Sequence, residues 1–240
     1  MYLAQYLALS GTTSRRKAIE LIKNKKISVN GQIIINPNTK VTKKDIVTYE
    51  NKKIFLQKSI YILLNKPVGY ITSLSDEHNR KTVIDLISSE IKERVVPVGR
   101  LDYDTSGLLL LTNDGPLITK LIHPSHKVSK SYLVKLSRAL EQKDFEKLFN
   151  GIILHDGPIK PDKLFYPYKK DKTSIIVQLH SGRNRIVRRI FSYLRYKILE
   201  LKRIGFCFLT LKGLKDGNWR FLTPNEINSL KTLNFYKIKP

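Results

Sequence analysis

The carboxylate of Asp102 has an unusual setting for a basic chain. It lies in the segment GRLDYDTSGLLLLTND (99–114), in a turn just before a run of four leucines. An aspartate is ionised at neutral pH, with an unperturbed pKa of about 3.9, and a strand behind a turn is a rigid mount for a reacting group. Aspartates in turns are also common turn formers, a role that suits Asp104 and Asp114. Spacing alone therefore does not choose among the three.

A second candidate is the arginine-rich segment GRNRIVRRIFSYLR (182–195). The chain holds 13 arginines against 31 lysines, yet five of the arginines fall within this segment. A guanidinium binds phosphate bidentately and stacks on bases, so a helix with an arginine face predicts a nucleic-acid contact rather than a merely solvated surface. At helical spacing one face carries Ile186, Val187, Ile190, Phe191 and Leu194, and the opposite face carries Arg185, Arg188, Arg189 and Arg195.

The composition predicts a polyanionic partner. The 240 residues hold 44 Lys and Arg against 20 Asp and Glu, a formal net charge of +24. Nucleic acid is the first candidate, although a genome that favours Lys, Ile and Asn codons would also raise this charge. The single cysteine, Cys207, allows no intramolecular disulfide and no C-x-x-C zinc pair, and we predict that it is a small core residue. With no signal-peptide pattern and no apolar run of membrane-spanning length, we expect a cytoplasmic protein.

Residues 1–58 are predicted to form a small, separate basic domain, which carries 12 Lys and Arg against 3 acidic residues. Apolar spacing predicts a helix over LAQYLALSG that ends at Gly11, and a second over RRKAIELIKN that the preceding Thr-Thr-Ser run can cap. KISVNGQIII then has the pattern of a hairpin with an Asn-Gly turn. Residues 50–59 are expected to form a linker. The basic side chains at the start of the second helix are Arg15, Arg16 and Lys17.

Residues 59–240 are predicted to form a second domain with an α+β fold, built on a mixed, mostly antiparallel sheet flanked by helices. Strands are predicted over YILLNKP, SGLLLLTND, KSYLVKL, TSIIVQLH and YKILELKRIGFCFLTL. Helices are predicted over TVIDLISSEI, GPLITKLIHP, EQKDFEKLFNG, RNRIVRRIFSYL and PNEINSLKTL.

Several of these segments resemble the motifs of pseudouridine synthases, in particular of the group that acts on single sites in ribosomal RNA. PVGRLDYDTSGLLLLTNDG resembles their catalytic motif, and YILLNKPVGYITS, KSYLVKL and SGRNRIVRRIF resemble their first, second and third motifs in the same order. SGTTSRRKAIELIKNKKISVNGQII resembles the small RNA-binding domain of the S4 type. The resemblance covers nearly the whole chain. It implies an S4-like domain in front of a catalytic domain that needs no cofactor and no metal ion.

The resemblance also implies roles for individual residues. Asp102 is the essential catalytic residue, Tyr132 stacks on the uracil and assists proton transfer, and Arg188 pairs with the aspartate. Arg100 is implied to enter the RNA helix where the target base leaves. From the resemblance and the charge pattern together, we predict RNA contacts for Arg15, Arg16, Lys17, Arg183, Arg185 and Arg189.

The implied reaction suits these residue types. It breaks the bond from ribose to the uracil nitrogen, turns the base and forms a bond to carbon, so it needs an ionised carboxylate near the sugar but no redox partner or group donor. Whether Asp102 adds to the substrate or abstracts a ribose proton stays open. Extruding the base costs a few kcal/mol, of which stacking on Tyr132 returns about 1–3 kcal/mol.

Three positions depart from the family pattern. Ile186 stands where glutamine is usual, Ser181 where an acidic residue is usual, and Tyr2 where a basic residue is common. These departures bring the contacts to the RNA backbone into question more than they do catalysis.

Two interpretations without catalysis compete with the enzyme. One is a non-catalytic RNA-binding factor for ribosome assembly, against which Asp102, Tyr132 and Arg188 together argue. The other is a structural ribosome-associated protein that acts by charge alone, which predicts binding without sequence preference and little effect from loss of Asp102. A metal-dependent nuclease would need clustered ligands, for which His123 and His126 are the nearest approach. We expect a monomeric enzyme on ribosomal RNA, of the large subunit rather than the small, either free or within a ribosomal subunit precursor.

Overall fold

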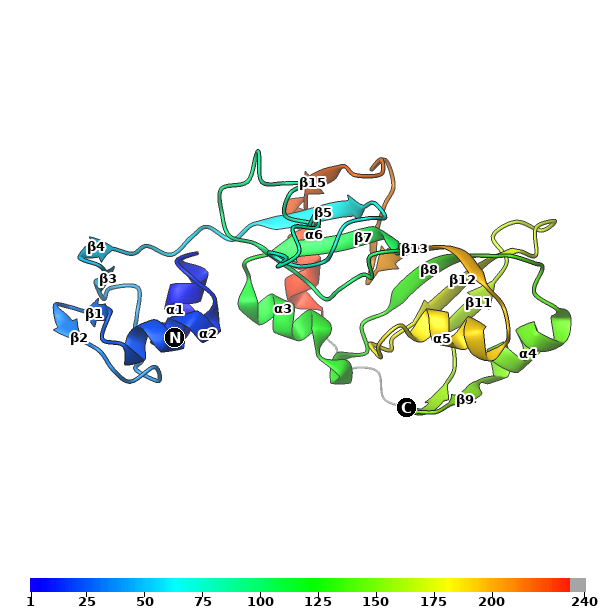
Figure 1. Cartoon of the computed structure of the whole chain (residues 1–240), viewed down its shortest axis with the longest axis horizontal. Helices are drawn as coiled ribbons and strands as arrows, with labels where there is room; N and C mark the ends of the chain where they lie inside the picture. Colours follow the sequence, from blue (N-terminus) through cyan, green and yellow to red (C-terminus); the bar gives the residue numbers. More distant parts are fainter. Residues whose placement is uncertain (234–240) are drawn as a thin grey trace. The chain divides into compact units, whose positions relative to one another are not determined.

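The computed structural model describes residues 1–233, which form two compact units (Figure 1). The first unit comprises residues 1–60 with the short segments 91–95 and 113–115. The second comprises residues 61–90, 96–112 and, among the described residues, 116–233. The main boundary along the chain therefore falls between Ile60 and Tyr61.

The first unit contains the two predicted helices and the predicted hairpin. Ser14 caps the second helix, because its side chain accepts a hydrogen bond from the Lys17 backbone N–H. The strands pair in the order β2-β1-β3-β4 and are all antiparallel. Its buried core includes Leu3, Leu7 and Ile22 from the helices. The elements are α1 (Leu3–Leu9), α2 (Arg15–Lys23), β1 (Ile27–Val29), β2 (Gln32–Ile33), β3 (Val47–Tyr49) and β4 (Lys52–Lys53).

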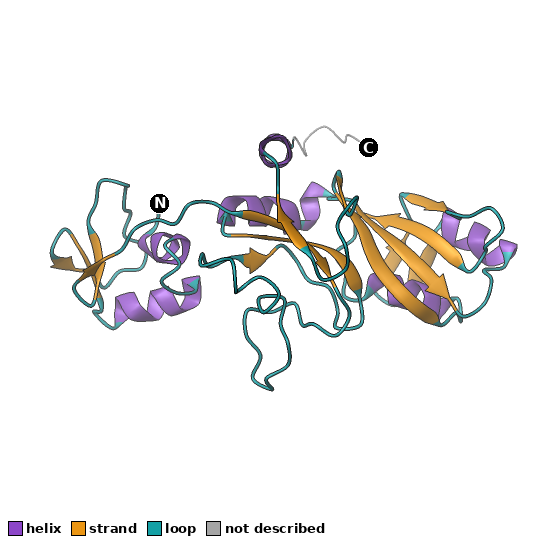
Figure 2. Ribbon diagram, turned by 90° about the horizontal axis from the view of Figure 1, so that it is seen from above, coloured by secondary structure: helices purple, strands orange, loops and turns teal. Residues whose placement is uncertain are grey.

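The second unit is built on one sheet of nine strands, which confirms the predicted mixed and mostly antiparallel sheet (Figure 2). Among the pairings of its strands within the described residues, only that of β13 with β7 is parallel. The main path runs β11 (Lys163–Phe165), β12 (Ser174–Leu179), β8 (Lys130–Leu136), β13 (Ile198–Phe206), β7 (Ser106–Thr112), β5 (Tyr61–Lys66) and β15 (Trp219–Phe221). β14 (Leu209–Thr210) and β6 (Val96–Pro97) pair with β13 and β7, and β9 (Ile152–Leu154) and β10 (Gly157–Ile159) form a separate hairpin.

Four of the five helices predicted for this unit form, and one does not. The segment TVIDLISSEI folds into successive turns instead. Its backbone hydrogen bonds mostly join residues three apart, such as those from Ile87 to Ile84 and from Glu90 to Ile87, so the four-residue pairing of an α-helix does not propagate. Within the described residues no helix has the length and apolar character needed to cross a bilayer. The elements that form are α3 (Gly115–Ile122), the 3-10 turn η1 (Pro124–His126), α4 (Gln142–Asn150), α5 (Ile186–Tyr193) and α6 (Pro224–Thr232).

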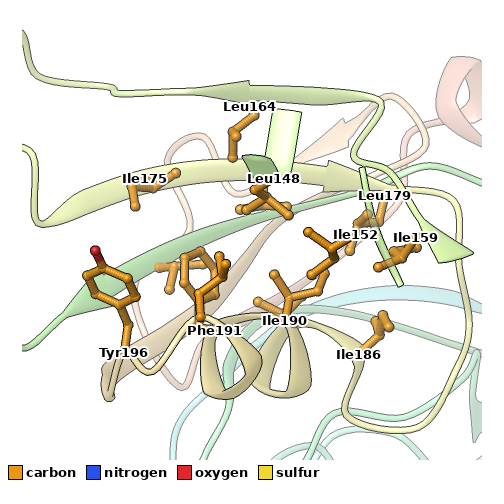
Figure 3. Close-up of a cluster of buried hydrophobic side chains, with 14 of the residues drawn as sticks. Leu148, Ile152, Ile159, Leu164, Ile175, Leu179, Ile186, Ile190, Phe191 and Tyr196 are labelled. Carbon is orange, nitrogen blue, oxygen red and sulfur yellow. The ribbon is translucent and has the colours of Figure 1, made fainter. Parts of the chain in front are cut away.

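The helix α5 lies on the sheet with the predicted apolar face inward (Figure 3). Ile190 and Phe191 are completely buried, and Ile186, Val187 and Leu194 are nearly so. They pack against residues of β8, β12 and β13 in one hydrophobic cluster. Burying a side chain of this kind stabilises the fold by about 1.5–3 kcal/mol relative to exposure, so this face fixes the position of α5 on the sheet.

A second cluster covers the other part of the sheet, where α3 and α6 pack on β5 and β7. The four leucines of β7 are all buried, and Leu108 and Leu110 belong to this cluster. Cys207 packs against it while partly buried, in partial agreement with its predicted core position. The buried strand β7 therefore gives the loop before it a fixed support.

Candidate active site

A cavity of about 630 Å³ in the second unit gathers most of the residues singled out in this part of the sequence. It lies among the loop 97–105, the strands β8 and β13, and the segment that leads into α5. Asp102, Tyr132 and Arg188 all line it, as do Arg100, Arg183 and Arg185, whereas Arg189 does not. The structure thus brings together, in one cavity, the three residues for which the resemblance implies a catalytic role.

Asp102 faces two arginines of the third motif, but its closer partner is not the one that was predicted. The Asp102 Oδ2 atom lies 3.3 Å from Nη1 of Arg185 and 4.0 Å from Nε of Arg188. Arg185 has a left-handed backbone, with φ of 47°, which is sparsely populated by non-glycine residues and clusters at functional sites. Arg185, expected from its charge to contact RNA, is therefore also a partner of the Asp102 carboxylate.

Arg188 holds the loop beside Asp102 through Asp104. Its Nη2 lies 3.0 Å from the Asp104 carboxylate and donates to the Asp104 carbonyl (3.0 Å) and the Thr105 hydroxyl (3.3 Å). The Arg188 Nε is buried and has no hydrogen-bond acceptor. Asp104, interpreted from the sequence as a turn former, is thus also the counter-ion that orients Arg188.

Lys66, for which no role was predicted from the sequence, fixes the same loop. Lys66 is fully buried, and its Nζ donates to the carbonyl oxygens of Pro67 (3.0 Å), Asp102 (3.2 Å) and Thr105 (2.9 Å). Burial lowers the pKa of this lysine to about 8, against the opposing effect of nearby carboxylates. The signal in the sequence was a lysine at the end of the strand YILLNK, which begins with four apolar or aromatic residues.

The backbone before Asp102 is pinned by a threonine. The Thr72 hydroxyl donates to the Leu101 carbonyl (2.7 Å) and accepts from the Leu101 N–H (3.2 Å). Together with Lys66, this contact holds the chain on both sides of the Asp102 side chain. The carboxylate is therefore presented on a preorganised loop, as an electrostatic role in catalysis requires.

Tyr132 is positioned by the centre of the sheet. It lies on β8, where it pairs with Val177 of β12 and with Arg203 of β13, and its side chain is partly buried at the cavity. Arg203 lines the same cavity and is 2% exposed, and its Nε donates to the Leu108 carbonyl (2.7 Å). Arg203 had no assigned role in the sequence analysis.

Close approach of β13 to β7 depends on Gly107. A Cβ atom at this position would lie 2.2 Å from the carbonyl oxygen of Arg203, and the φ of Gly107 is 109°. Both conditions exclude a side chain without movement of a strand. The glycine of the SGLLLLT segment thus allows the parallel pairing that brings Arg203 beside the cavity.

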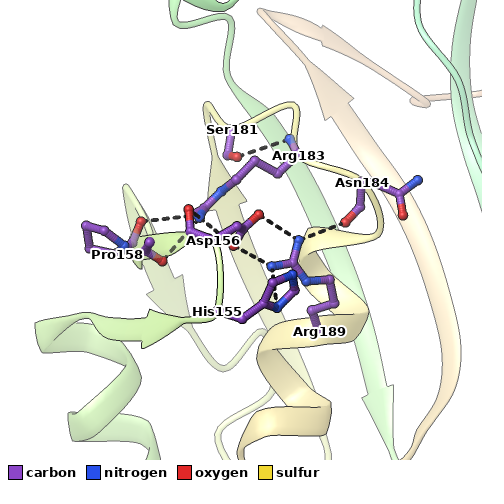
Figure 4. A network of polar contacts seen from close by, with 8 residues as sticks. His155, Asp156, Pro158, Ser181, Arg183, Asn184 and Arg189 are labelled. Carbon is purple, nitrogen blue, oxygen red and sulfur yellow. Dashed lines mark hydrogen bonds and ion pairs between the residues drawn. The ribbon is translucent and has the colours of Figure 1, made fainter.

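Asp156 organises the segment that leads into α5 (Figure 4). Arg183 donates to its carboxylate (2.9 Å) and to the carbonyl of Pro158 (2.7 Å), and Arg189 binds both carboxylate oxygens. Arg189, followed by Arg183, holds the pKa of Asp156 down at about 2. The segment lacks an acidic residue at Ser181, and a carboxylate reaches it instead from the β9–β10 turn. RNA binding by these two arginines stays a prediction.

The other predicted RNA contacts are exposed cations. Arg100 is exposed beside the cavity in the second unit. The three cations predicted from the first unit are exposed on the first turn of α2. They are Arg15, Arg16 and Lys17.

The histidine pair considered for a nuclease makes ordinary polar contacts. His123 bonds to the Ser125 hydroxyl (2.7 Å) and His126 to the Lys120 carbonyl (2.6 Å). Among residues 1–233 there is no group of three or more potential metal ligands. The pair therefore gives no support to a metal-dependent nuclease.

Comparison with known proteins identifies the class to which this fold and site belong. Residues 60–193 match the RNA pseudouridylate synthase family, and residues 3–47 match the S4 domain. The chain belongs to the RNA pseudouridylate synthase family, which confirms the resemblance seen in its motifs. It is an RNA-modifying isomerase that converts uridine to pseudouridine.

Individual relatives cover almost the entire chain. The ribosomal large subunit pseudouridine synthase B of Bacillus subtilis is 43% identical over 96% of this chain and 96% of its own. An RNA pseudouridine synthase of Aquifex aeolicus is 39% identical over 94% of this chain and 92% of its own. A crystal structure of a pseudouridylate synthase superposes with a TM-score of 0.68 at 28% identity, covering 96% of this chain and 99% of its own.

Proposed function

We propose that this enzyme converts a specific uridine of large-subunit ribosomal RNA to pseudouridine, with Asp102 as the catalytic carboxylate. The observation that carries the assignment is the position of Asp102, on a loop held by Lys66 and Thr72, facing Arg185 in a cavity that Tyr132 lines. The 43% identity to the Bacillus subtilis enzyme for the large subunit supports the choice of RNA.

The geometry divides the work of the reaction among a few side chains. Arg185 and Arg188 place positive charge beside the Asp102 carboxylate, which is proposed to act next to the ribose of an extruded nucleotide. The ring of Tyr132 offers a stacking face for the uracil and returns about 1–3 kcal/mol of the cost of extrusion. Lys66 acts through the loop backbone as a positioning residue.

Affinity for RNA is proposed to come from exposed cations. Arg100 and Arg185 lie at the cavity, and Arg15, Arg16 and Lys17 lie on α2 of the S4 unit. Phosphate contacts release counterions, so binding should weaken steeply as salt is raised. We further propose that the enzyme is a monomer and works in the cytoplasm on rRNA, either free or within a precursor of the ribosomal subunit.

Mapping of pseudouridine by carbodiimide treatment and primer extension tests this proposal. Unmodified large- and small-subunit rRNA transcripts, and precursor particles of both subunits, are incubated with the wild-type enzyme and with Asp102→Asn. We expect a new stop at one uridine of large-subunit rRNA with the wild type, and none with Asp102→Asn at unchanged RNA affinity. A stop confined to small-subunit rRNA would refute the choice of RNA, and turnover by Asp102→Asn at the wild-type rate would refute the catalytic role.

A further inference from the structure

Arg203 is a buried guanidinium that the fold alone leaves incompletely bonded. It is 2% exposed, and within residues 1–233 no carboxylate forms an ion pair with it. Its Nε is satisfied by the Leu108 carbonyl, but its Nη2 is buried without any hydrogen-bond acceptor. An unmade bond at a buried donor costs about 1–3 kcal/mol, and more when the group is charged. Retaining such a group needs a compensating partner.

The unpaired nitrogen belongs to a residue of the active-site cavity. Arg203 pairs with Tyr132 across β13 and β8, and both side chains line the cavity with Asp102. Burial lowers the pKa of Arg203, and the Tyr132 hydroxyl, by charge and hydrogen bonding, opposes that effect. The guanidinium therefore sits beside the ring on which the extruded base is proposed to stack.

Because Arg203 is buried, only certain parts of the RNA can contact it. Arg100 is exposed and Arg185 has a side chain 47% exposed, so both suit the phosphates, which stay in solvent. Arg203 is accessible only to the group that enters the cavity, which is the base. Uracil carries two carbonyl oxygens, and a carbonyl oxygen is an acceptor of the kind that Nη2 lacks.

We propose that Arg203 donates a hydrogen bond from Nη2 to a carbonyl oxygen of the flipped uracil and so helps to select this base. The inference rests on the proposed function, because it takes Asp102 and Tyr132 as the site of the reacting uridine. A base that presents an amino group to the guanidinium would leave two donors facing each other in a buried site. Such a mismatch discriminates strongly between otherwise similar substrates.

Atomic substitution in the substrate tests this contact. Stem-loop RNAs that carry uridine, 2-thiouridine or 4-thiouridine at the mapped position are assayed for kcat/KM with the wild type and with Arg203→Met. Sulfur accepts hydrogen bonds poorly, so one of the two thio-RNAs should lose about tenfold with the wild type. The same thio-RNA should lose less than about twofold, relative to uridine, with Arg203→Met, because the contact is already gone.

A neighbouring cation provides the matched control. Lys130 lines the same cavity and is also partly buried, so Lys130→Met should keep the wild-type ratio between thio-RNA and uridine RNA. A purely structural role for Arg203 would lower activity on all three RNAs by one common factor, which would overturn the inference. It would also be overturned if neither thio-RNA differed from uridine with the wild type, a result that does not depend on whether the variant folds.

The two proposals fail in distinguishable ways. If the wild type forms no pseudouridine in the rRNA transcripts or in the precursor particles, the proposed function fails and the base contact fails with it. If product forms but the thio effects are equal in the wild type and Arg203→Met, only the base contact is wrong.

Discussion

The position of Asp102, the proposed catalytic residue, is fixed by groups that are distant in the sequence. Lys66 donates to its backbone carbonyl from 36 residues away, and Arg185 reaches its carboxylate from the third motif. Sequence motifs marked Asp102, Tyr132 and Arg188, since each lies within a characteristic local pattern. Lys66 and the counter-ion role of Asp104 escaped prediction, because a buried lysine and a paired turn aspartate look ordinary until the chain is folded.

Loss of the Lys66 ammonium should slow the chemical step. Lys66→Met removes all three donors to the loop carbonyls, and a small misplacement of a reacting group can cost about 10²-fold in rate. We therefore expect a fall of this order in the single-turnover rate at saturating RNA. Unchanged RNA affinity by filter binding would serve as the control, and a wild-type rate would contradict the positioning role.

The rate of the wild type should also fall as the pH rises through about 8, the pKa of Lys66. When Lys66 loses its proton, the neutral amine has only two N–H groups to donate to the three carbonyls of Pro67, Asp102 and Thr105, so one of these hydrogen bonds is lost. Folding lowers the pKa of Lys66 from 10.5 to about 8. Between about pH 8 and pH 10.5 the unfolded chain therefore binds more protons at Lys66 than the folded chain does. As a result, Lys66 makes the free energy of unfolding rise with pH in this range. A pH profile of rate compared with one of stability, with Lys66→Met as reference, checks this. A fall of equal steepness in Lys66→Met would contradict the assignment.

Among the elements, the helix α5 and the strand β13 each position residues that line the cavity, including Arg188 on α5 and Arg203 on β13. The apolar face of α5 could be predicted, because a period of 3.6 residues is visible within one segment. The pairing of β13 with β7 could not be predicted in this way, because Arg203 and Gly107, which it brings side by side, lie far apart in the sequence. The segment TVIDLISSEI, predicted as a helix, shows the limit of local patterns, because successive turns bury its Val83 and Ile87 just as a helix would.

A side chain at Gly107 should weaken this strand pairing. Gly107→Ala places a Cβ against the Arg203 backbone at a positive φ, and we expect a loss of at least about 2 kcal/mol in the free energy of unfolding. Urea denaturation measures this loss. Gly182→Ala is the control, because no atom lies within 4 Å of the added Cβ. Equal stability of the two variants would show that β7 and β13 tolerate separation.

Removing the Asp156 charge should loosen the segment before α5. The pKa of this carboxyl is lowered on folding to about 2, so its stabilising effect is present above its unfolded pKa and is lost as the pH falls toward 2. Asp156→Asn should therefore melt at a lower temperature than the wild type at pH 6, and the difference should shrink as the pH is lowered from about 4. A difference that persisted at pH 2 would indicate packing rather than charge.

At the scale of the whole molecule, the two units are expected to divide binding from chemistry. Their types were predictable from the sequence because charge density, helix caps and motifs change near residue 59. The net charge of +24 is spread over both, but the exposed cations on α2 are not among the residues that line the catalytic cavity.

Neutralising α2 should weaken binding without slowing the reaction of bound RNA. In Arg15→Gln/Arg16→Gln/Lys17→Gln we expect a higher Kd and a salt dependence reduced by about 0.7–0.9 for each phosphate that is no longer bound. Filter binding across a salt series measures this, with single-turnover rates at saturating RNA as the second readout. Lys43→Gln/Lys44→Gln, also exposed in this unit, is the matched control. A slope equal to the wild type would exclude α2 from RNA binding.

The central place of β13 has a consequence for how the enzyme is made. This strand joins β8 to β7 in the middle of the sheet, yet a ribosome synthesises it after both of them and after β5, β11 and β12. Until it emerges, the inner edge of β8 is unpaired, and the inner edge of β7 is paired only by β6 at Leu111 and Thr112; such edges are templates for aggregation. β13 then pairs along β8 and with Ser106 and Gly107 of β7, in the same event that brings Arg203 to the cavity. The nascent chain should therefore need chaperones at least until β13 has paired.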